Sequence, residues 1–391
     1  MTSDASSSRI IIAGAGPTGL MLGCFLAQKN IPFRIYEPRA QVSQHSRSIG
    51  IHPPSLSLFE KTGLLPRLLE AGNKITTGRA FVNQQEVGAI DFGRLPHDYP
   101  FILTVSQEIT ERLLETRLEE LALGSLKRGR SVTGFTQPRS RDLNEPVRVE
   151  LDNGTEEEAA YLVACDGKNS RLREQAGIPF RGGEYPDAYI MGDFEDGLAG
   201  RDEALVFLCQ DGLVESFPHG ANTRRWVVKT TGMTQAPEPL MVAREAQRRT
   251  GLQPDVSTNS MCSAFGVQRL MAESFYKKRL ILAGDAAHVV SPIGGQGMNL
   301  GWLDAQLLAE LMPDILGPDK PRPGLLNSYE YRRRNAAYKA AQRAEFNLKM
   351  GRAYAGNAFN IAAKKLTVKA MLFPPVQTFM IKKFTMDGLE L

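Results

Sequence analysis

The hexapeptide Gly14-Ala15-Gly16-Pro17-Thr18-Gly19 joins an apolar run of strand length, Arg9–Ala13, to a helical pattern that extends to Lys29. Proline suits the first turn of such a helix. A second short strand is predicted at Phe33–Tyr36, and it ends at Glu37. This order predicts a compact βαβ unit with a glycine-rich turn between its first strand and its helix.

The three glycines and Glu37 have the spacing of a dinucleotide-binding site. One glycine permits the tight turn, another lets the backbone approach a pyrophosphate at the helix N-terminus, and a third allows close packing of helix against strand. An acid in the position of Glu37 favours an adenosine ribose with a free 2′-hydroxyl, as in FAD or NAD. A glycine turn alone occurs in many α/β proteins, so the prediction depends on the strand, the helix and the acid together.

Two further turns follow predicted parallel strands. Cys165-Asp166-Gly167-Lys168-Asn169-Ser170-Arg171-Leu172-Arg173 comes after the run Tyr161–Cys165, and by itself it is also typical of an Asp-Gly turn with a serine cap. The run Arg279–Ala283 leads into Gly284-Asp285-Ala286-Ala287-His288, and Ser291–Asn299 precedes a helix predicted at Leu300–Leu311. Open α/β sheets bind ligands beyond the carboxyl ends of their strands, so one elongated cofactor can touch all three turns.

The remaining pattern predicts a mixed α/β fold. A helix is expected at Gln107–Leu123, and short alternating segments such as Ala204–Leu208, Val214–Phe217 and Arg225–Lys229 predict an antiparallel sheet. We expect a Rossmann-like dinucleotide-binding domain formed by residues 1–180 and 270–325, with a helical segment at 326–391. A substrate domain at 181–269, with a contribution from about 75–104, is inserted between the third and fourth parallel strands.

Composition excludes several other classes of protein. The 391 residues include 36 glycines and 23 prolines and are 42% hydrophobic, which argues against a disordered, collagenous or coiled-coil chain. The net charge of +4 divides into +9 for the tail after Tyr331 and −5 for the rest, which does not indicate nucleic-acid binding. Four dispersed cysteines indicate neither a zinc site nor a disulfide framework, so we expect no metal and a cytoplasmic location.

These motifs together resemble the FAD-dependent aromatic hydroxylases, the group A flavin monooxygenases typified by para-hydroxybenzoate hydroxylase and the tetracycline-degrading monooxygenases. The resemblance covers about residues 8–345. It rests on GAGPTG with Glu37, on DGxxSxxR at Asp166, and on GDAAH with PxGGQGMN between Asp285 and Asn299.

The resemblance implies a role for each matching residue. Asp285 would bind the ribitol of FAD, and Asp166 would connect FAD binding with NAD(P)H. Arg47 would lie near the pyrophosphate, and we favour this role over the alternative of a surface cation. Gln107 and Arg112 would form a polar pair near the cofactor, although Gln107 can also complete a capping box with Thr104. The ADP half would contact Gly14, Gly16, Pro17, Thr18, Gly19 and Glu37, and the flavin ring would contact Gly295, Gln296, Gly297, Met298 and Asn299.

The implied reaction is hydroxylation of an aromatic or polycyclic secondary metabolite. NAD(P)H, with NADPH favoured by the resemblance, would reduce FAD, and O2 would then form a flavin C4a-hydroperoxide that transfers a hydroxyl group to the substrate. This flavin chemistry needs no protein nucleophile, so His288 is predicted to be structural. Phe217, Arg225 and Pro292 are candidates for the substrate pocket, although core packing and a surface cation explain the first two equally well.

Two other functions stay open from the sequence. A related flavoenzyme could epoxidise or reduce an isoprenoid or quinone lipid at a membrane, because Ala362–Met380 mixes lysines with apolar residues. The alternative for this tail, which we favour, is a helical cap on the FAD domain with a solvated basic face. A flavin-dependent sensor is a third class, and it would bind FAD without turnover.

Overall fold

A computed structural model describes residues 9–43, 48–138, 145–198, 203–317 and 322–389. Its first sheet has six strands in the order β18-β19-β12-β1-β2-β8. Five of them are parallel, and β18 pairs antiparallel with β19 at one edge. The strands are β1 (Ile10–Ala13), β2 (Phe33–Glu37), β8 (Leu126–Arg128), β12 (Tyr161–Ala164), β18 (Tyr276–Lys277) and β19 (Leu280–Leu282).

Strand β8 corrects the expected connectivity. Its sequence Leu-Lys-Arg has no apolar run, because it lies at the edge of the sheet and pairs only with β2 among the described strands. With β8 counted, the second sheet is inserted between the fourth and fifth parallel strands in chain order, instead of between the third and fourth.

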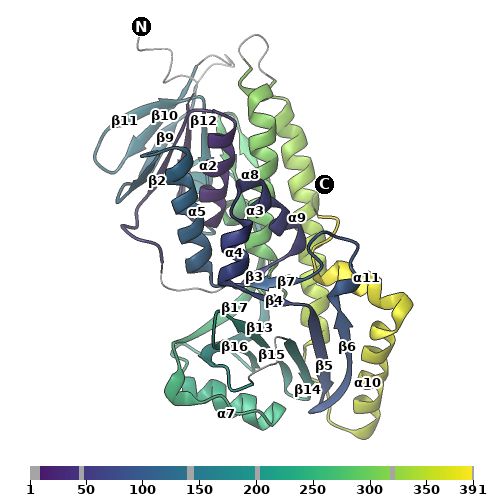
Figure 1. Cartoon of the computed structure of the whole chain (residues 1–391). Helices are drawn as coiled ribbons and strands as arrows, with labels where there is room; N and C mark the ends of the chain where they lie inside the picture. The colour runs from purple at the N-terminus through teal and green to yellow at the C-terminus, as the bar shows by residue number, and fades with distance from the viewer. Residues whose placement is uncertain (1–8, 44–47, 139–144, 199–202, 318–321, 390–391) are drawn as a thin grey trace.

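Helices cover the parallel sheet. The helix α2 (Pro17–Gln28) packs against both α5 (Gln107–Leu121) and α8 (Gln296–Ile315), as Figure 1 shows. The small sheet of β9 (Val132–Thr136), β10 (Val147–Leu151) and β11 (Glu156–Ala159) contacts β12. Helix α8 begins at Gln296 instead of Leu300, because Gly295 adopts a left-handed conformation at its N-terminus.

The second sheet has eight strands in the order β20-β17-β13-β16-β15-β14-β5-β6. It is antiparallel except between β14 and β5, because the β5–β6 hairpin comes from an earlier part of the chain and joins the edge of the sheet. Its strands are β5 (Thr77–Val82), β6 (Gln85–Asp91), β13 (Phe180–Glu195), β14 (Ala204–Cys209), β15 (Gly212–His219), β16 (Thr223–Thr230), β17 (Met261–Ala272) and β20 (His288–Val289).

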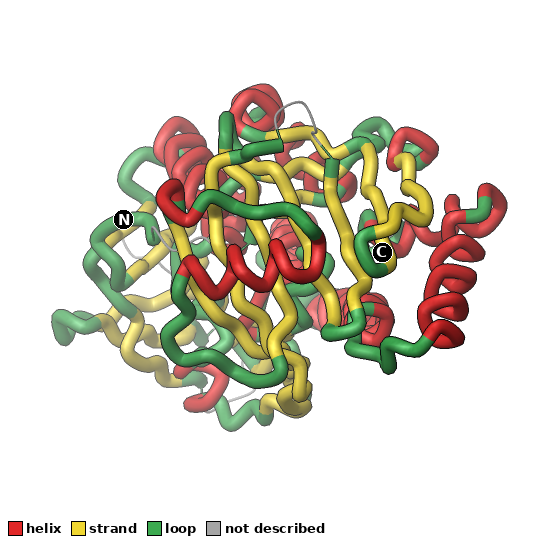
Figure 2. The backbone as a smooth tube through the Cα atoms, turned by 90° about the horizontal axis from the view of Figure 1, so that it is seen from below, coloured by secondary structure: helices red, strands yellow, loops and turns green. Residues whose placement is uncertain are grey.

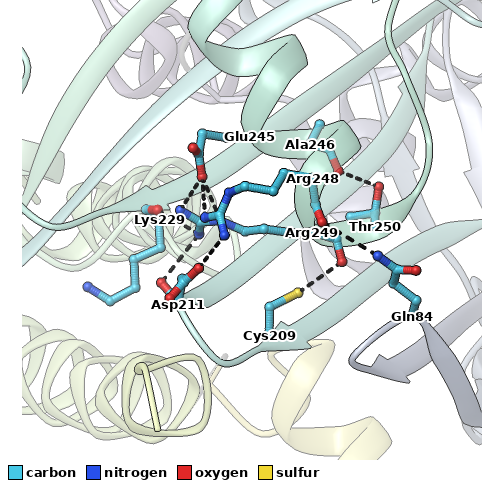
Figure 3. A network of polar contacts seen from close by, with 9 residues as sticks. All are labelled: Gln84, Cys209, Asp211, Lys229, Glu245, Ala246, Arg248, Arg249 and Thr250. Carbon is cyan, nitrogen blue, oxygen red and sulfur yellow. Dashed lines mark hydrogen bonds and ion pairs between the residues drawn. The ribbon is translucent and has the colours of Figure 1, made fainter. Parts of the chain in front are cut away.

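Helix α7 (Pro239–Thr250) covers the outer face of this sheet, as Figure 2 shows from below. Its last turn is fastened to the strands by a polar network, drawn in Figure 3. Arg248 Nη1 lies 2.6 Å from Asp211 Oδ2, and Arg249 Nη1 donates a 2.9 Å hydrogen bond to the carbonyl of Lys229. The outer face is therefore closed, and the inner face is the one available to a ligand.

The tail is helical, as expected, but only its first helix covers the dinucleotide-binding domain, as was predicted for the whole tail. Helix α9 (Leu325–Met350) packs on α8, whereas α10 (Ala358–Leu372) packs against β5 and β6 of the second sheet (Figure 1). Helix α11 (Pro374–Phe384) begins at the proline pair that interrupts the tail. Within the described residues, none of the helices is long and apolar enough to cross a membrane.

Short elements complete the connection between the two large sheets. They are β3 (Gly50–Ile51), α3 (Pro53–Thr62), α4 (Leu65–Ala71), β4 (Asn73–Ile75), β7 (Ile102–Thr104) and α6 (Arg171–Gln175). Strand β7 pairs with β3 and β4, and the Thr104 hydroxyl donates a 2.5 Å hydrogen bond to the carbonyl of Pro218 on β15. The first part of the chain is thereby tied to the second sheet.

Candidate active site

One cavity of about 1100 Å³ is lined by residues of both large sheets. It extends from the glycine-rich turn after β1, past the turns after β12 and β19, to the inner face of β13–β16 and to α10. Such a volume exceeds the usual range of ligand pockets, about 300–1,000 Å³, and leaves room for a large cofactor and a second ligand.

The three glycines after β1 have three different surroundings. Gly14 has a φ of +104°, and a Cβ there would lie 2.4 Å from the carbonyl oxygen of Cys165. A Cβ on Gly19 would lie 2.0 Å from the carbonyl oxygen of Gly14, whereas a Cβ on Gly16 would meet nothing within 4 Å. Gly14 and Gly19 therefore permit the close turn and packing, while Gly16 leaves the helix N-terminus open for an anionic ligand.

Glu37 lies at the end of β2, buried at the same end of the cavity. Its carboxylate accepts a 2.8 Å hydrogen bond from the Ala15 amide and a 2.7 Å bond from Arg39 Nε. Burial raises the pKa of Glu37, but the hydrogen bonds from Arg39 and Ala15 outweigh burial and lower it below its usual value. Glu37 is therefore an ionised acceptor beside the turn.

The Asp166 turn adds a second wall. Ser170 Oγ accepts a hydrogen bond from the Arg173 amide, so the serine cap expected from the sequence is present. Arg173 Nη1 in turn donates to the carbonyl of Ala286 at 3.2 Å, which joins this turn to the next one. Asp166 lines the cavity, burial raises its pKa, and its buried Oδ1 has no partner within the described residues. An orphaned buried oxygen of this kind fits a ligand hydroxyl.

The turn after β19 is held by a buried ion-pair cluster. Asp304 on α8 accepts hydrogen bonds from the Gly284 amide at 2.9 Å and from Arg333 Nε at 2.7 Å. His288 Nε2 lies 2.6 Å from Asp304 Oδ2. The His288 side chain is buried in the core and does not line the cavity. This cluster leaves Asp285 exposed to the cavity. Desolvation by the cavity walls raises the pKa of Asp285.

The loop before α8 contributes mainly backbone atoms to the cavity wall. Gly294 and Gly295 both have positive φ angles, +92° and +65°, which a side chain would strain. Asn299 does not line the cavity: its Nδ2 donates to the carbonyls of Gly50 and Gly295, and its Oδ1 accepts from the His52 amide. The Asn299 side chain thus braces the loop.

The polar residues near α5 are only partly brought together. Gln107 lines the cavity, but Arg112 points outward and pairs with Glu108 at 2.6 Å. The capping box with Thr104 is wrong, since the N-cap is Ser106, whose Oγ accepts from the Ile109 amide. Arg47 lies outside the described residues.

The sheet wall follows the alternation of its strands. On β15, Leu213, Glu215 and Phe217 line the cavity, whereas Val214 packs into the cluster under α7. On β16, Arg225 lines the cavity with Val227, and Trp226 faces α7. Period-2 alternation from Phe217, a residue already singled out, was the sequence signal that could have identified Glu215.

Arg225 is a buried cation, and the surface alternative is wrong. It is 2% exposed, and its Nε and Nη2 each lie 2.7 Å from Asp193 on the neighbouring strand β13. His219 Nε2 lies 3.3 Å from Asp193 Oδ2. Burial raises the pKa of Asp193, but Arg225 and His219 outweigh it and lower the pKa below its usual value. Sequence reasoning identified neither Asp193 nor His219, because their strands pair only in the fold.

The structure thus brings most of the sequence candidates to one cavity. Gly19, Gln296 and Asn299 do not line it, although Gly19 and Asn299 shape the turns that do. The lining residues among the candidates are Gly14, Gly16, Pro17, Thr18, Glu37, Gln107, Asp166, Phe217, Arg225, Asp285, Pro292, Gly295, Gly297 and Met298.

Comparisons with known proteins agree with this architecture. Residues 7–344 match the family model described as an FAD binding domain. The rifampicin monooxygenase of Streptomyces venezuelae is 29% identical over 389 residues, which cover 96% of this chain and 78% of the relative. A tetracycline-pathway enzyme of Streptomyces rimosus, the 12-dehydrotetracycline 5-monooxygenase/anhydrotetracycline 6-monooxygenase, is 31% identical over 345 residues, 84% of this chain and 67% of the relative.

A solved structure extends the comparison to a different reaction. The Diels-Alderase PyrE3 of pyrroindomycin biosynthesis superposes with a TM-score of 0.81 at 26% identity, over 97% of this chain and 80% of that one. The glycine-rich turn, the buried acid beside it and the family match lead to the same assignment. The chain belongs to the family of FAD-binding aromatic monooxygenases.

Proposed function

We propose that this protein is a single-component monooxygenase that uses FAD, NAD(P)H and O2 to hydroxylate an aromatic or polycyclic small molecule. The observation that carries the proposal is one continuous cavity, which joins the nucleotide-binding turns to an apolar sheet wall. Its size is suited to a cofactor and an acceptor side by side.

The residues at the turns fit FAD. Gly16 leaves space at the N-terminus of α2 for a pyrophosphate, and Glu37 and Asp285 offer carboxylates toward the hydroxyls of a ribose and a ribitol. Bound FAD would supply the redox chemistry and the activation of O2. The N-terminus of α8 opens beside Gly297 and Met298, where the helix dipole would stabilise negative charge on a flavin ring.

The sheet wall fits an aromatic acceptor. Phe217, Met191 and Val227 offer apolar contacts, and α10 closes the far side with Val368, Met371 and Leu372. These side chains would exclude water from the acceptor and orient its ring. Arg225 adds a polar contact whose position is fixed by Asp193.

Only one βαβ unit with a GxGxxG turn occurs in the sequence. NAD(P)H would therefore reach the flavin without a binding domain of its own, and it would approach beside Asp166. We favour NADPH as the reductant. The test is to purify the protein, record its flavin absorbance, and measure NADPH and NADH oxidation and O2 uptake with a panel of phenols, polyketides and quinones. A flavin-free protein, or bound flavin whose reduction and O2 uptake no acceptor stimulates, would refute the proposal.

A second reaction class is suggested by the resemblance to PyrE3. A cycloaddition forms new carbon–carbon bonds without consuming O2, so the enzyme would convert its substrate with no NAD(P)H oxidation. The rifampicin and tetracycline enzymes favour oxygen transfer. Product formation under strict anaerobiosis without reductant would decide for cycloaddition.

A lipid substrate at a membrane surface is the other candidate. Helix α10 lines the cavity on one side and exposes Phe359 and Leu366 on the other, at 80% and 71%. Phe379 on α11 is 57% exposed. Co-sedimentation of the holoenzyme with anionic vesicles, reduced when Phe359 and Phe379 are both changed to Ser, would support this candidate. No binding at low salt would eliminate it.

A further inference from the structure

Glu215 lies in the middle of the sheet wall, in an otherwise apolar row. Its cross-strand neighbours are Val206 on β14 and Val227 on β16. The next residues outward in the row are Ala80 on β5 and Met191 on β13. All five side chains line the cavity, so the carboxyl group faces the space that we assign to the acceptor.

The charged groups around Glu215 are bound to other partners. On β16, Arg225 is held by Asp193, with two contacts of 2.7 Å. Lys229 lies 3.0 Å from Asp187, and Arg352 Nη2 lies 2.8 Å from the same carboxylate. On β5, Arg79 lines the cavity next to Ala80 and is paired with Glu86 and Glu203.

The remaining elements that face Glu215 carry few ionisable groups. Tyr189 on β13 is a buried phenol whose pKa is raised mainly by burial. From α9 and α10 the cavity receives Phe346, Asn347, Met350, Val368, Met371 and Leu372, none of which is ionisable. Glu215 therefore makes no ion pair or hydrogen bond within the part of the chain that the structure describes.

This isolation changes the acidity of Glu215. Because burial is not offset by a partner, it raises the pKa of Glu215 from 4.5 to about 7. A carboxyl group that titrates near the operating pH is suited to proton transfer, and a cavity wall is where such a group can reach a substrate.

We propose that Glu215 is the general base that removes the hydroxyl proton of a phenolic acceptor, and that the substrates of this site are phenols that are un-ionised in neutral solution. The inference rests on the proposed monooxygenase function. In this step the phenol O–H bond breaks and an O–H bond forms on the Glu215 carboxylate. The negative charge moves to the phenolate oxygen, which makes the ring a better acceptor for an electrophilic oxygen.

The test compares Glu215→Gln with the wild-type holoenzyme at pH 8 on two probes, 2-naphthol, which is un-ionised at this pH, and 4-nitrophenol, which is largely ionised. We expect Glu215→Gln to lower kcat for 2-naphthol about 100-fold with KM within about twofold, and to lower kcat for 4-nitrophenol less than about threefold. The limb of the 2-naphthol profile with a midpoint near pH 7 should disappear. Equal losses with both probes would show a structural role and overturn the inference.

Glu195→Gln is the matched control, because Glu195 lies on the same sheet, is exposed, and is outside the cavity lining. It should retain wild-type kcat and KM with both probes. A wild-type enzyme that hydroxylates aromatic acceptors without a hydroxyl group, but no phenol, would overturn the inference and leave the proposed function intact.

Infrared titration of the oxidised holoenzyme gives a readout without turnover. The band of a protonated carboxyl group should titrate with a midpoint near pH 7 in the wild type and be absent in Glu215→Gln. A wild type without this band contradicts the assignment of the base. If the wild type shows this band but does not oxidise NAD(P)H with any of the acceptors, the proposed function would be contradicted instead.

Discussion

The two ends of the cavity are built in different ways. At the turns after β1 and β19, glycines and backbone amides make the surface, and the polar side chains are acceptors at its edge. At the sheet, side chains from several strands make the surface, and β14, β15 and β16 each contribute alternate residues. A cofactor shared by a family suits a backbone site, whereas an acceptor that differs among relatives suits a wall whose side chains can change.

The largest effect should come from Gly14, at the turn end. Gly14→Ala would place a Cβ 2.4 Å from the Cys165 carbonyl at a φ of +104°. We expect the free energy of unfolding to fall by more than about 4 kcal/mol, with loss of bound FAD. Denaturant unfolding of the purified variant measures this. A variant that unfolds at the wild-type midpoint would contradict the close packing of these two turns.

The corresponding side-chain support at the sheet end is Asp193. Asp193→Asn would leave Arg225 without its buried counter-charge, so we expect a loss of about 3 kcal/mol. FAD affinity of the fraction that stays folded should not change, because Asp193 does not line the turns. Urea unfolding and flavin titration check both parts, and an equal loss of FAD affinity would remove the distinction between the ends.

The pH dependence of stability gives a smaller effect of opposite sign. Glu215 has a folded-state pKa of about 7, above its unfolded value of 4.5, so ionisation destabilises the fold as pH rises between these values. Glu215→Gln should therefore be more stable than wild type by about 2 kcal/mol at pH 6, and nearly equal at pH 4.5. Unfolding at the two pH values gives the difference, and a gap that does not change with pH would contradict the raised pKa.

The smallest effect separates binding from folding at the turn end. A Cβ on Gly16 meets no protein atom within 4 Å, so Gly16→Ala should unfold within about 0.5 kcal/mol of wild type. It should nevertheless weaken FAD binding about 10-fold, which corresponds to about 1.4 kcal/mol, because the methyl group occupies the approach of the pyrophosphate. Flavin fluorescence titration measures the affinity. Unchanged affinity would show that the cofactor does not approach this amide.

The same difference explains what could be predicted from the sequence. The turn after β1 is local, so its strand, glycines, helix and acid occur within residues 10–37 and were predicted with nearly correct bounds. Strand β8 was missed, because an edge strand of sequence Leu-Lys-Arg carries no apolar signal.

The sheet wall required pairing between distant strands. Asp193 and Arg225 are 32 residues apart and meet only through the register of β13 with β16. Asn299 was expected at the cofactor from the family resemblance alone, and the hydrogen bonds of its side chain run to the loop and to β3. Local spacing therefore predicted the motifs, and tertiary pairing decided which side chains face the cavity.

The most direct test of the account is the fate of O2 in one turnover experiment. Holoenzyme supplied with NADPH, an acceptor that stimulates NADPH oxidation, and ¹⁸O2 should form a product that contains one ¹⁸O atom on its ring. A converted product without ¹⁸O, or conversion by flavin-free protein, would contradict the claim that one cavity holds FAD at its turns and an aromatic acceptor at its sheet.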